Sequence, residues 1–424
     1  MKFIYKLLSL SLAIACLSGC SAANTEIASS SAATATVTPT TDSTEVPASN
    51  NVFTSAGDGL YVTTDSGIYE LQTVFPYSAN IFYTDANTKE RIFLCANPNC
   101  THADESCPSY IATPSAMFPP MLLRVGDQLL VVFTEATDSS NPHGMLMNMD
   151  GSNRRTVFEL ASNQYMQGGF CTSGNDLYFD LYEINDSGNV TYQLWYVSFE
   201  NGTSEKVMDL GSDSDHYSLC DGANNELCFN HVSSDGISYC MYNPQSKTIS
   251  DPFFVDSSVS GNSMIQDGYL FVLDEQASSV QRIRLSDKEK ASASFTVKEG
   301  FGAPSMRYLF DGNLMITEAQ TTASDIPTDG SYGVCSYILD FGTRNCTEFT
   351  LQTPYNNRPV YVLTTIGDAC YVATDYKTYT PTSVSEDGTV SNFDYVANIY
   401  AFITKQDYIN SNQNGYSMVK DAFE

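Results

Sequence analysis

The chain has 424 residues, with 49 acidic side chains against 20 Lys and Arg, and a formal net charge of -29 at pH 7. This shortage of cations excludes the class of proteins that bind nucleic acid through its phosphates, because such binding needs clustered Lys and Arg. Hydrophobic residues make up 42% of the sequence, with 27 Tyr and 23 Phe, so disorder throughout the chain is excluded as well.

Residues 1–19 have the pattern of a secretory signal. A short basic start precedes an apolar run over residues 7–17, which is too short to span a bilayer. The run ends in a Leu-Ser-Gly-Cys motif at Cys20, which resembles the lipobox of bacterial lipoproteins. The resemblance implies cleavage after residue 19 and diacylation of Cys20. The alternative is an ordinary signal peptide with an incidental cysteine.

Residues 20–51 are predicted to be a disordered tether. They are dominated by Ser, Thr, Ala and Pro, contain no Lys or Arg, and cannot bury enough apolar surface to offset the entropy of ordering. We therefore expect a folded body at the extracytoplasmic face of the cell membrane, held by the diacylglycerol on Cys20. The acidic chain argues against an electrostatic attachment to anionic lipid, so the acyl chains must supply the anchoring.

From residue 52 to residue 424, a turn followed by an apolar strand recurs seven times, at intervals of 43 to 69 residues. The copies are 57–62, 126–131, 174–179, 224–229, 267–272, 311–316 and 367–372. Further strands with period-2 alternation of Tyr, Phe, Val and Ile follow each copy. We therefore predict an all-β protein, a β-propeller with seven four-stranded blades. The alternatives are six or eight blades, or a pair of unrelated β domains.

The repeat pattern resembles the TolB-like and related propellers of bacterial exported lipoproteins. The resemblance covers residues 52–424 and implies a fold only, because propellers serve as sensors, scaffolds, hydrolases and lyases. It assigns no catalytic residue. The ring could close in two ways: residues 415–419 could complete the last blade, or residues 51–54 could add a strand to it.

Four insertions interrupt the repeats. They are 133–144, 180–191, 317–334 and 373–397. We expect them on one face of the ring, and long loops on a rigid frame usually carry binding. The last insertion holds Tyr376, Tyr379, Phe393 and Tyr395 beside acidic residues, which suits sugar or peptide binding. The alternative is that these rings pack a small core of the loop itself.

The sharpest local signal is a Cys/His-rich insertion at about residues 95–115, after the last predicted strand of the first blade. Cys95, Cys100, His102 and Cys107 are ligands enough for one closed, tetrahedral, structural Zn site. Disulfides and unpaired packing are the alternatives. The segment also resembles an L-C-x-x-P-x-C-x-H motif of uncharacterised lipoproteins of Gram-positive bacteria, and that resemblance names no role.

Disulfides are expected elsewhere, because ten cysteines remain after loss of Cys16 with the signal and lipidation of Cys20. Cys228 and Cys240 flank one predicted turn, and Cys335 and Cys346 flank another. Each pair is predicted to bridge two adjacent antiparallel strands.

The sequence contains no G-x-S-x-G, H-E-x-x-H, G-x-x-x-x-G-K or G-x-G-x-x-G motif. We therefore expect a lipid-anchored, non-enzymatic propeller that binds a protein or glycan through its loop-rich face. One alternative is a glycan-active hydrolase or lyase that uses carboxylates near the channel, so enzymatic activity stays an open question. Another is a scaffold for envelope assembly.

Overall fold

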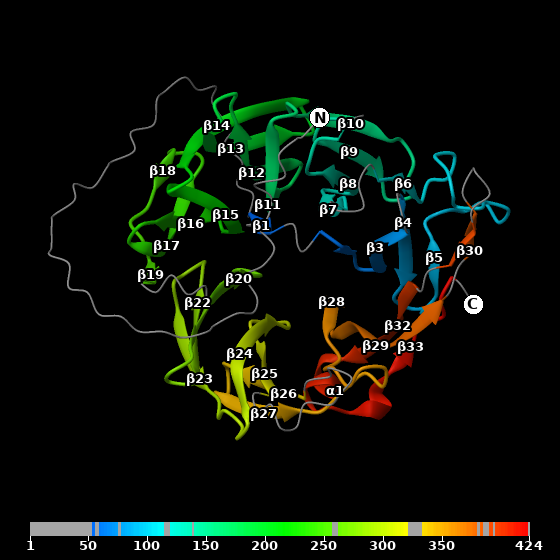
Figure 1. The fold of residues 1–424 in the computed structure, drawn as a ribbon, viewed down its shortest axis with the longest axis vertical. Coiled ribbons are helices and arrows are strands. Elements are labelled where there is room, and N and C mark those ends of the chain that lie inside the picture. The colour runs from blue at the N-terminus through cyan, green and yellow to red at the C-terminus, as the bar shows by residue number, and fades with distance from the viewer. Residues whose placement is uncertain are drawn as a thin grey trace, which may run out of the picture.

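The computed structural model describes residues 53–55, 59–74, 78–113, 119–137, 140–256, 262–320, 333–379, 382–384, 390–392 and 395–422. Within these residues the chain is almost entirely β, and its sheets stand around a common centre (Figure 1). This arrangement is a β-propeller, which confirms the predicted fold class.

In the described residues, the strands follow one another as seven antiparallel meanders, here called units 1 to 7. Unit 1 contains β2 (Tyr61–Thr63), β3 (Gly67–Val74), β4 (Ser78–Asp85), β5 (Arg91–Phe93) and β6 (Tyr110–Ala112). Unit 2 contains β7 (Met121–Val125), β8 (Gln128–Phe133), β9 (His143–Asn148) and β10 (Arg155–Glu159). Unit 3 contains β11 (Gln164–Ser173), β12 (Asp176–Ile184), β13 (Val190–Ser198) and β14 (Thr203–Ser212).

The later units repeat the same order. Unit 4 contains β15 (Asp215–Ala223), β16 (Glu226–Ser233), β17 (Gly236–Asn243), β18 (Thr248–Ile249) and β19 (Phe254–Asp256). Unit 5 contains β20 (Ser263–Gln266), β21 (Tyr269–Asp274), β22 (Ser279–Arg284) and β23 (Lys290–Ser294). Unit 6 contains β24 (Phe301–Tyr308), β25 (Leu314–Gln320), β26 (Val334–Asp340) and β27 (Asn345–Phe349).

Unit 7 ends the ring. It contains β28 (Val362–Ile366), β29 (Ala369–Tyr379), β32 (Tyr395–Thr404) and β33 (Ser417–Met418). The short ribbon of β30 (Thr382–Val384) and β31 (Val390–Asn392) lies between β29 and β32, and α1 (Lys405–Ile409) and the 3-10 helix η2 (Gln413–Gly415) precede β33. In the described part of the chain, no helix has the length and apolarity needed to cross a membrane.

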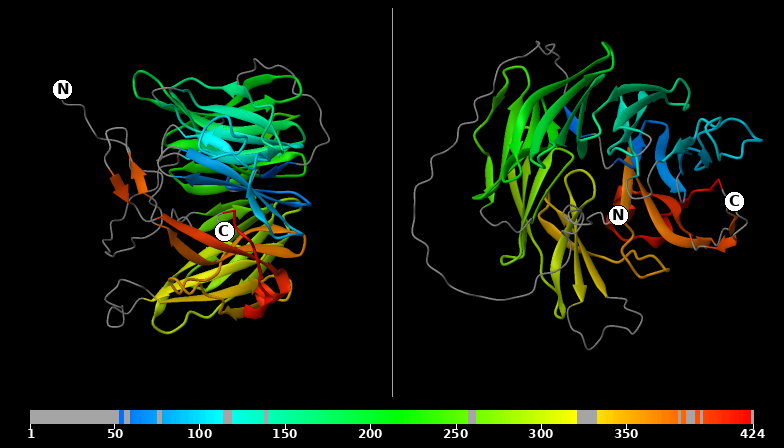
Figure 2. Two further views of the ribbon diagram at one scale, coloured as in Figure 1. Left: turned by 90° about the vertical axis from the view of Figure 1, so that its right-hand side faces the viewer. Right: turned by 45° about the horizontal axis from the view of Figure 1, so that its top comes forward.

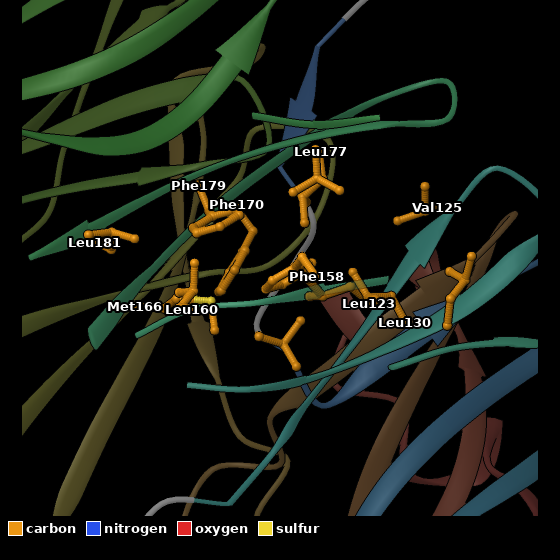
Figure 3. Packing of buried hydrophobic residues seen from close by; sticks show 13 residues of the cluster. Leu123, Val125, Leu130, Phe158, Leu160, Met166, Phe170, Leu177, Phe179 and Leu181 are labelled. Atoms are coloured by element: carbon orange, nitrogen blue, oxygen red, sulfur yellow. The ribbon is translucent and has the colours of Figure 1, made fainter. Parts of the chain in front are cut away.

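The hydrophobic core is divided among the contacts between neighbouring units. The described part of the chain contains seven buried clusters, and each joins two units that are adjacent in the ring, including units 7 and 1. Figure 3 shows the cluster between units 2 and 3, where Leu123 and Leu130 lie across from Phe170 and Phe179. Units 3 and 4 share one ten-stranded sheet, because β14 pairs with β15. The number of seven blades therefore stays a prediction, and the seven clusters support it.

Six of the seven predicted turns connect the first and second strands of a unit. Residues at these turns take positive φ angles, among them Asn224 (55°) and Asp267 (52°), which Asn and Asp tolerate better than most residues. The first copy, 57–62, is out of register: Tyr61 already belongs to the inner strand β2. The equivalent turn of unit 1 runs from Thr64 to Gly67, where the Thr64 hydroxyl bonds the backbone of Gly67, and none of its residues takes a positive φ.

All four predicted insertions connect the second and third strands of their units, which places them on one side of the ring, here called the insertion face. The opposite side, where first and second strands connect, is called the turn face. Two insertions are largely strand rather than loop. β12 and β13 stay paired up to Ile184 and Val190, and β29 and β32 stay paired up to Tyr379 and Tyr395. The β30–β31 ribbon projects from one side of the ring (Figure 2, left).

The chain closes the ring with its last residues. β33 pairs with β32, so residues 415–419 do complete unit 7. The other predicted closure is wrong: β1 (Thr54–Ser55) pairs with β11 of unit 3 instead of unit 7. The reason is hydrophobic, because Phe53 is buried in the cluster between units 3 and 4 and meets the Tyr178 ring edge-on at 5.3 Å.

Candidate functional site

The Cys/His-rich segment is an excursion of the outermost strand of unit 1. Both β5 and β6 pair with β4, so they are two halves of one interrupted edge strand. The chain leaves the ladder where Leu94 N donates to Ile81 O (2.9 Å) and returns where Ile81 N donates to Ser109 O (2.8 Å). The sequence placed this segment after the last strand of the first blade, but β6 shows that the same edge strand resumes beyond it, and the segment projects from the outer side of the ring (Figure 1).

The four predicted ligands converge within this excursion. The ligand atoms of Cys95, Cys100, His102 and Cys107 all lie within 4.8 Å of one another, and Cys107 is buried. His102 Nδ1 is 3.3 Å from the Cys107 sulfur. The turn that the spacing requires occurs at His102, which has a φ of 56°, and its ring stacks on Phe93 at 4.0 Å. This cluster could bind a metal ion.

Hydrogen bonds around the sulfurs favour a thiolate at one position. The Ser109 backbone N–H donates to the Cys107 sulfur at 3.4 Å, and the Ser109 hydroxyl lies 3.1 Å from it. Burial opposes ionisation of Cys107, but the bonds from Ser109 and His102 outweigh it and lower its pKa to about 6. At Cys95 burial dominates and raises the pKa to about 11. A bound cation would favour the ionised form of every one of these thiols.

Unit 2 holds the returning end of the excursion in place. The Arg154 guanidinium donates to the carbonyls of Pro108 and Tyr110, the latter at 2.7 Å. Gly151, in the same turn as Arg154, packs so closely that a side chain there would meet the Pro108 carbonyl. The sequence offered no signal for this clamp, because Arg154 lies far along the chain from the cysteines and carries no motif.

Neither predicted cross-strand disulfide is present, and all ten cysteines of the described residues are free thiols. The strand register gives the reason. Cys228 lies opposite Met241 and Cys240 opposite Phe229, so the two cysteines are offset by one residue and point to opposite faces of the sheet. Cys346 lies opposite Leu339, four positions along β26 from Cys335, or about 13 Å at 3.3 Å per residue.

The aromatic residues of the last insertion are only partly described. The Tyr376 ring is half-buried and packs at 5.6 Å against Tyr355, outside the insertion. The backbones of Tyr379 and Tyr395 are paired across β29 and β32. Phe393 lies outside the described residues. The structure therefore brings the two paired tyrosine backbones together, and the use of this insertion in binding stays a prediction.

Sequence reasoning missed a pocket of about 450 Å³ inside the ring on the turn face. It is formed by the inner strands of units 5, 6, 7 and 1, and its polar lining includes Gln266, Asp267, Arg307, Tyr308 and Thr364. The available signal was the repeat itself, because its Asp-Gly turns at 267–268 and 311–312 end two of these strands.

Comparisons with known proteins add little. No family model matches the chain, and no curated protein sequence matches it significantly. Among solved structures it is similar to prolyl oligopeptidase B from Galerina marginata, with 11% identity and a TM-score of 0.40 over 81% of this chain and 46% of that one. An oligogalacturonate lyase from Vibrio parahaemolyticus has 10% identity and a TM-score of 0.39 over 82% of this chain and 91% of that one.

A putative 6-phosphogluconolactonase from Bacteroides fragilis has 12% identity and a TM-score of 0.37 over 84% of this chain and all of that one. The chain spans only 35% of the tricorn protease and less than half of prolyl oligopeptidase B. Similarities this remote carry no argument about function.

Proposed function

We propose that the protein is a lipid-anchored, extracytoplasmic β-propeller that binds a protein or glycan partner through its insertion face, and that the Cys/His cluster holds a structural Zn ion. The observation that carries the binding role is the placement of all four insertions on one face of a rigid ring. A ring that served only as a frame would not need them, and such additions to a rigid frame usually carry binding.

The entry point of the chain supports this orientation. Phe53 N donates to Asn224 O at 2.8 Å, and Asn224 belongs to the turn between β15 and β16, on the turn face. A tether over residues 20–51 would therefore join the ring on the turn face. Anchored at Cys20, the ring would hold its insertions on the side opposite the tether, free to meet a partner.

Lipid anchoring is tested by replacing Cys20 with Ala. The variant should move from the membrane fraction to the soluble fraction, because two acyl chains are lost together with the only proposed anchor. The matched control is Cys346→Ala, which removes an exposed cysteine of the ring. Retention of Cys20→Ala in the membrane would contradict the assignment.

Binding through the insertion face is tested with a shortened hairpin. Leu181 and Gln193 are cross-strand partners, so an Asn-Gly turn can join them in place of residues 182–192. A matched control replaces residues 244–247, on the turn face, by Asn-Gly between the partners Asn243 and Thr248.

The mature protein and both variants are applied to a glycan array. A photo-crosslinking residue at position 186, compared with one at position 245, tests for a protein partner in intact membranes. Signal that depends on the insertion face and survives in the control supports the proposal. Cleavage of any polysaccharide in the same assays would favour the hydrolase or lyase alternative.

Structural Zn is supported by the donor set. Three thiolates and one imidazole fill a tetrahedral coordination sphere and leave no position open for a substrate. The ion would close the neck of the excursion between Leu94 and Ser109, so that the two halves of the edge strand stay aligned on β4. Protein purified without added metal or reductant should contain about one Zn per chain.

The Zn site is tested by replacing Cys100 with Ala, which should lower the Zn content well below one ion per chain. Cys346→Ala is the control and should keep its Zn. Thiol counting in denaturant, after chelation, distinguishes the disulfide alternative. Absence of Zn together with missing thiols among Cys95, Cys100 and Cys107 would show that disulfides form there instead.

A further inference from the structure

The pocket inside the ring on the turn face has the size and the polar groups of a small-ligand site. Its volume of about 450 Å³ lies within the range of roughly 300 to 1,000 Å³ that is usual for such sites. Its walls are the ends of β20, β24 and β28, which surround the centre of the ring, together with Tyr61 of unit 1 (Figure 1). This site is separate from the insertion face and from the Cys/His cluster.

The charges of the pocket compensate one another. The Tyr308 hydroxyl donates to the Asp267 carboxylate. Lys405 binds both oxygens of Asp311 at 2.9 Å. Arg307, on the same wall, is exposed, and its guanidinium lies over the Tyr361 ring at 4.2 Å. The two lining carboxylates, Asp267 and Asp311, are balanced in number by Arg307 and by Lys405, which binds Asp311, so the site carries no net formal charge that would attract an ionic ligand.

The remaining hydrogen-bonding capacity suits a polyhydroxylated ligand. Arg307 has five N–H donors, Asp267 has lone pairs beyond the one that Tyr308 uses, and Gln266 can both donate and accept. The Thr364 hydroxyl already bonds that of Thr63 at 2.9 Å and can still accept. A sugar hydroxyl is a donor and an acceptor at once, so it can link such groups. Tyr61 and Met264 add apolar surface for the carbon skeleton. We propose that this pocket binds one or two units of a neutral saccharide.

Two substitutions test the proposal without removing the fold. Asp267 has a φ of 52°, a conformation that Asn also tolerates, so Asp267→Asn keeps the turn and removes an acceptor. Arg307→Ala removes the exposed donor. The matched control is Arg155→Ala, which removes another exposed arginine on the outer strand β10. Thermal unfolding confirms that all three variants are folded.

The mature protein in detergent is titrated with glucose, galactose, mannose, N-acetylglucosamine and cellobiose, and with glucuronate as a charged probe. Saturation-transfer NMR detects binding, and titration gives its affinity. We expect at least one neutral sugar to bind, with affinity lowered about tenfold or more by Asp267→Asn and Arg307→Ala, which is ~1.4 kcal/mol, and unchanged by Arg155→Ala.

Three results would overturn the inference: no binding of any neutral probe, binding of glucuronate alone, or binding that neither pocket variant changes. The variant with residues 182–192 replaced separates this site from the insertion face. It should keep its affinity for the sugar even if it loses the partner that we propose for that face.

Discussion

At the scale of single residues, the carboxyl group of Asp180 is buried at a position where its ionisation costs free energy. It lies in β12 with 1% of its surface exposed, and one of its oxygens accepts from Leu219 N at 3.1 Å. Burial raises its pKa to about 7, although the backbone donors oppose that shift. Cys171 and Cys220 lie near Asp180, and neither these thiols nor Asp221 beside them can offer a positive charge.

This pKa predicts a stability that depends on pH. The proton on Asp180 stabilises the folded state, because that state binds it more tightly than the unfolded state does. This stabilisation is complete below about pH 4 and decreases by about 1.4 kcal/mol per pH unit from there to about pH 7, above which it is lost. Asp180→Asn should therefore raise the free energy of unfolding relative to the wild type more at pH 8 than at pH 5.

Urea denaturation followed by the fluorescence of Trp195 measures the difference. Asp186→Asn, at the exposed tip of the same hairpin, is the matched control, and equal gains for Asp180→Asn at both pH values would contradict the assignment.

The cysteines show how far sequence predicts at this scale. The convergence of Cys95, Cys100, His102 and Cys107 could be predicted, because all four lie within thirteen residues and a single turn brings them together. The pairing of Cys228 with Cys240 could not be judged, because a one-residue shift of register decides which face each side chain occupies. Spacing along the chain does not fix that shift.

At the scale of the element, the Cys/His excursion makes the edge strand of unit 1 depend on the cluster. β5 and β6 contribute only three residues each to the ladder, and the hydrogen bonds at Ile81 join them. A metal ion bound only in the folded state stabilises that state by mass action. Removing Zn with a chelator should therefore accelerate hydrogen exchange at the amides of Ile81 and Leu94.

The amides of β8 in unit 2 are the internal control, because they pair with β7 and β9 and with no part of the excursion. Hydrogen exchange with mass spectrometry, before and after chelation, makes the comparison in one sample. If exchange at Ile81 and Leu94 does not change when Zn is removed, the ion does not hold the edge strand.

The repeat shows the corresponding limit for elements. Six turns could be found because Gly, Asp and Asn recur where the backbone takes positive φ. Unit 1 was misplaced by one strand, because its turn at 64–67 is closed by the Thr64 hydroxyl and contains no residue with positive φ. Long insertions were predicted as loops because their strands extend beyond the period of the repeat, as in the β12–β13 hairpin.

At the scale of the whole molecule, the ring is closed by contacts that no local pattern reveals. Asp421 and Tyr400 each meet a residue of unit 1 that lies 330 positions earlier in the chain. Arg91 N also donates to Lys420 O at 2.9 Å, which attaches the end of the chain to β5. Sequence periodicity predicts that units stack around a centre, but it does not specify which side chains join the last unit to the first.

The centre of this junction is a buried ion pair. Arg91 is 1% exposed, and its Nη2 lies 2.8 Å from Glu70 and 2.6 Å from the amide oxygen of Gln72. Its guanidinium also covers the Phe82 ring at 3.7 Å, and the Tyr400 hydroxyl of unit 7 donates to Glu70 at 2.5 Å. Removing Arg91 would leave the Glu70 carboxylate buried without a cation.

We therefore expect Arg91→Met to lower the free energy of unfolding by about 3–5 kcal/mol. The double variant Arg91→Met/Glu70→Gln should recover part of that loss, because a neutral Gln can still accept from Tyr400 and carries no unpaired charge. Arg284→Met is the matched control, since its ion pairs with Asp287 and Glu289 are solvent-exposed and contribute little to stability. Equilibrium denaturation gives all three values, and a loss for Arg91→Met no larger than that for Arg284→Met would mean that this ion pair does not hold the ring closed.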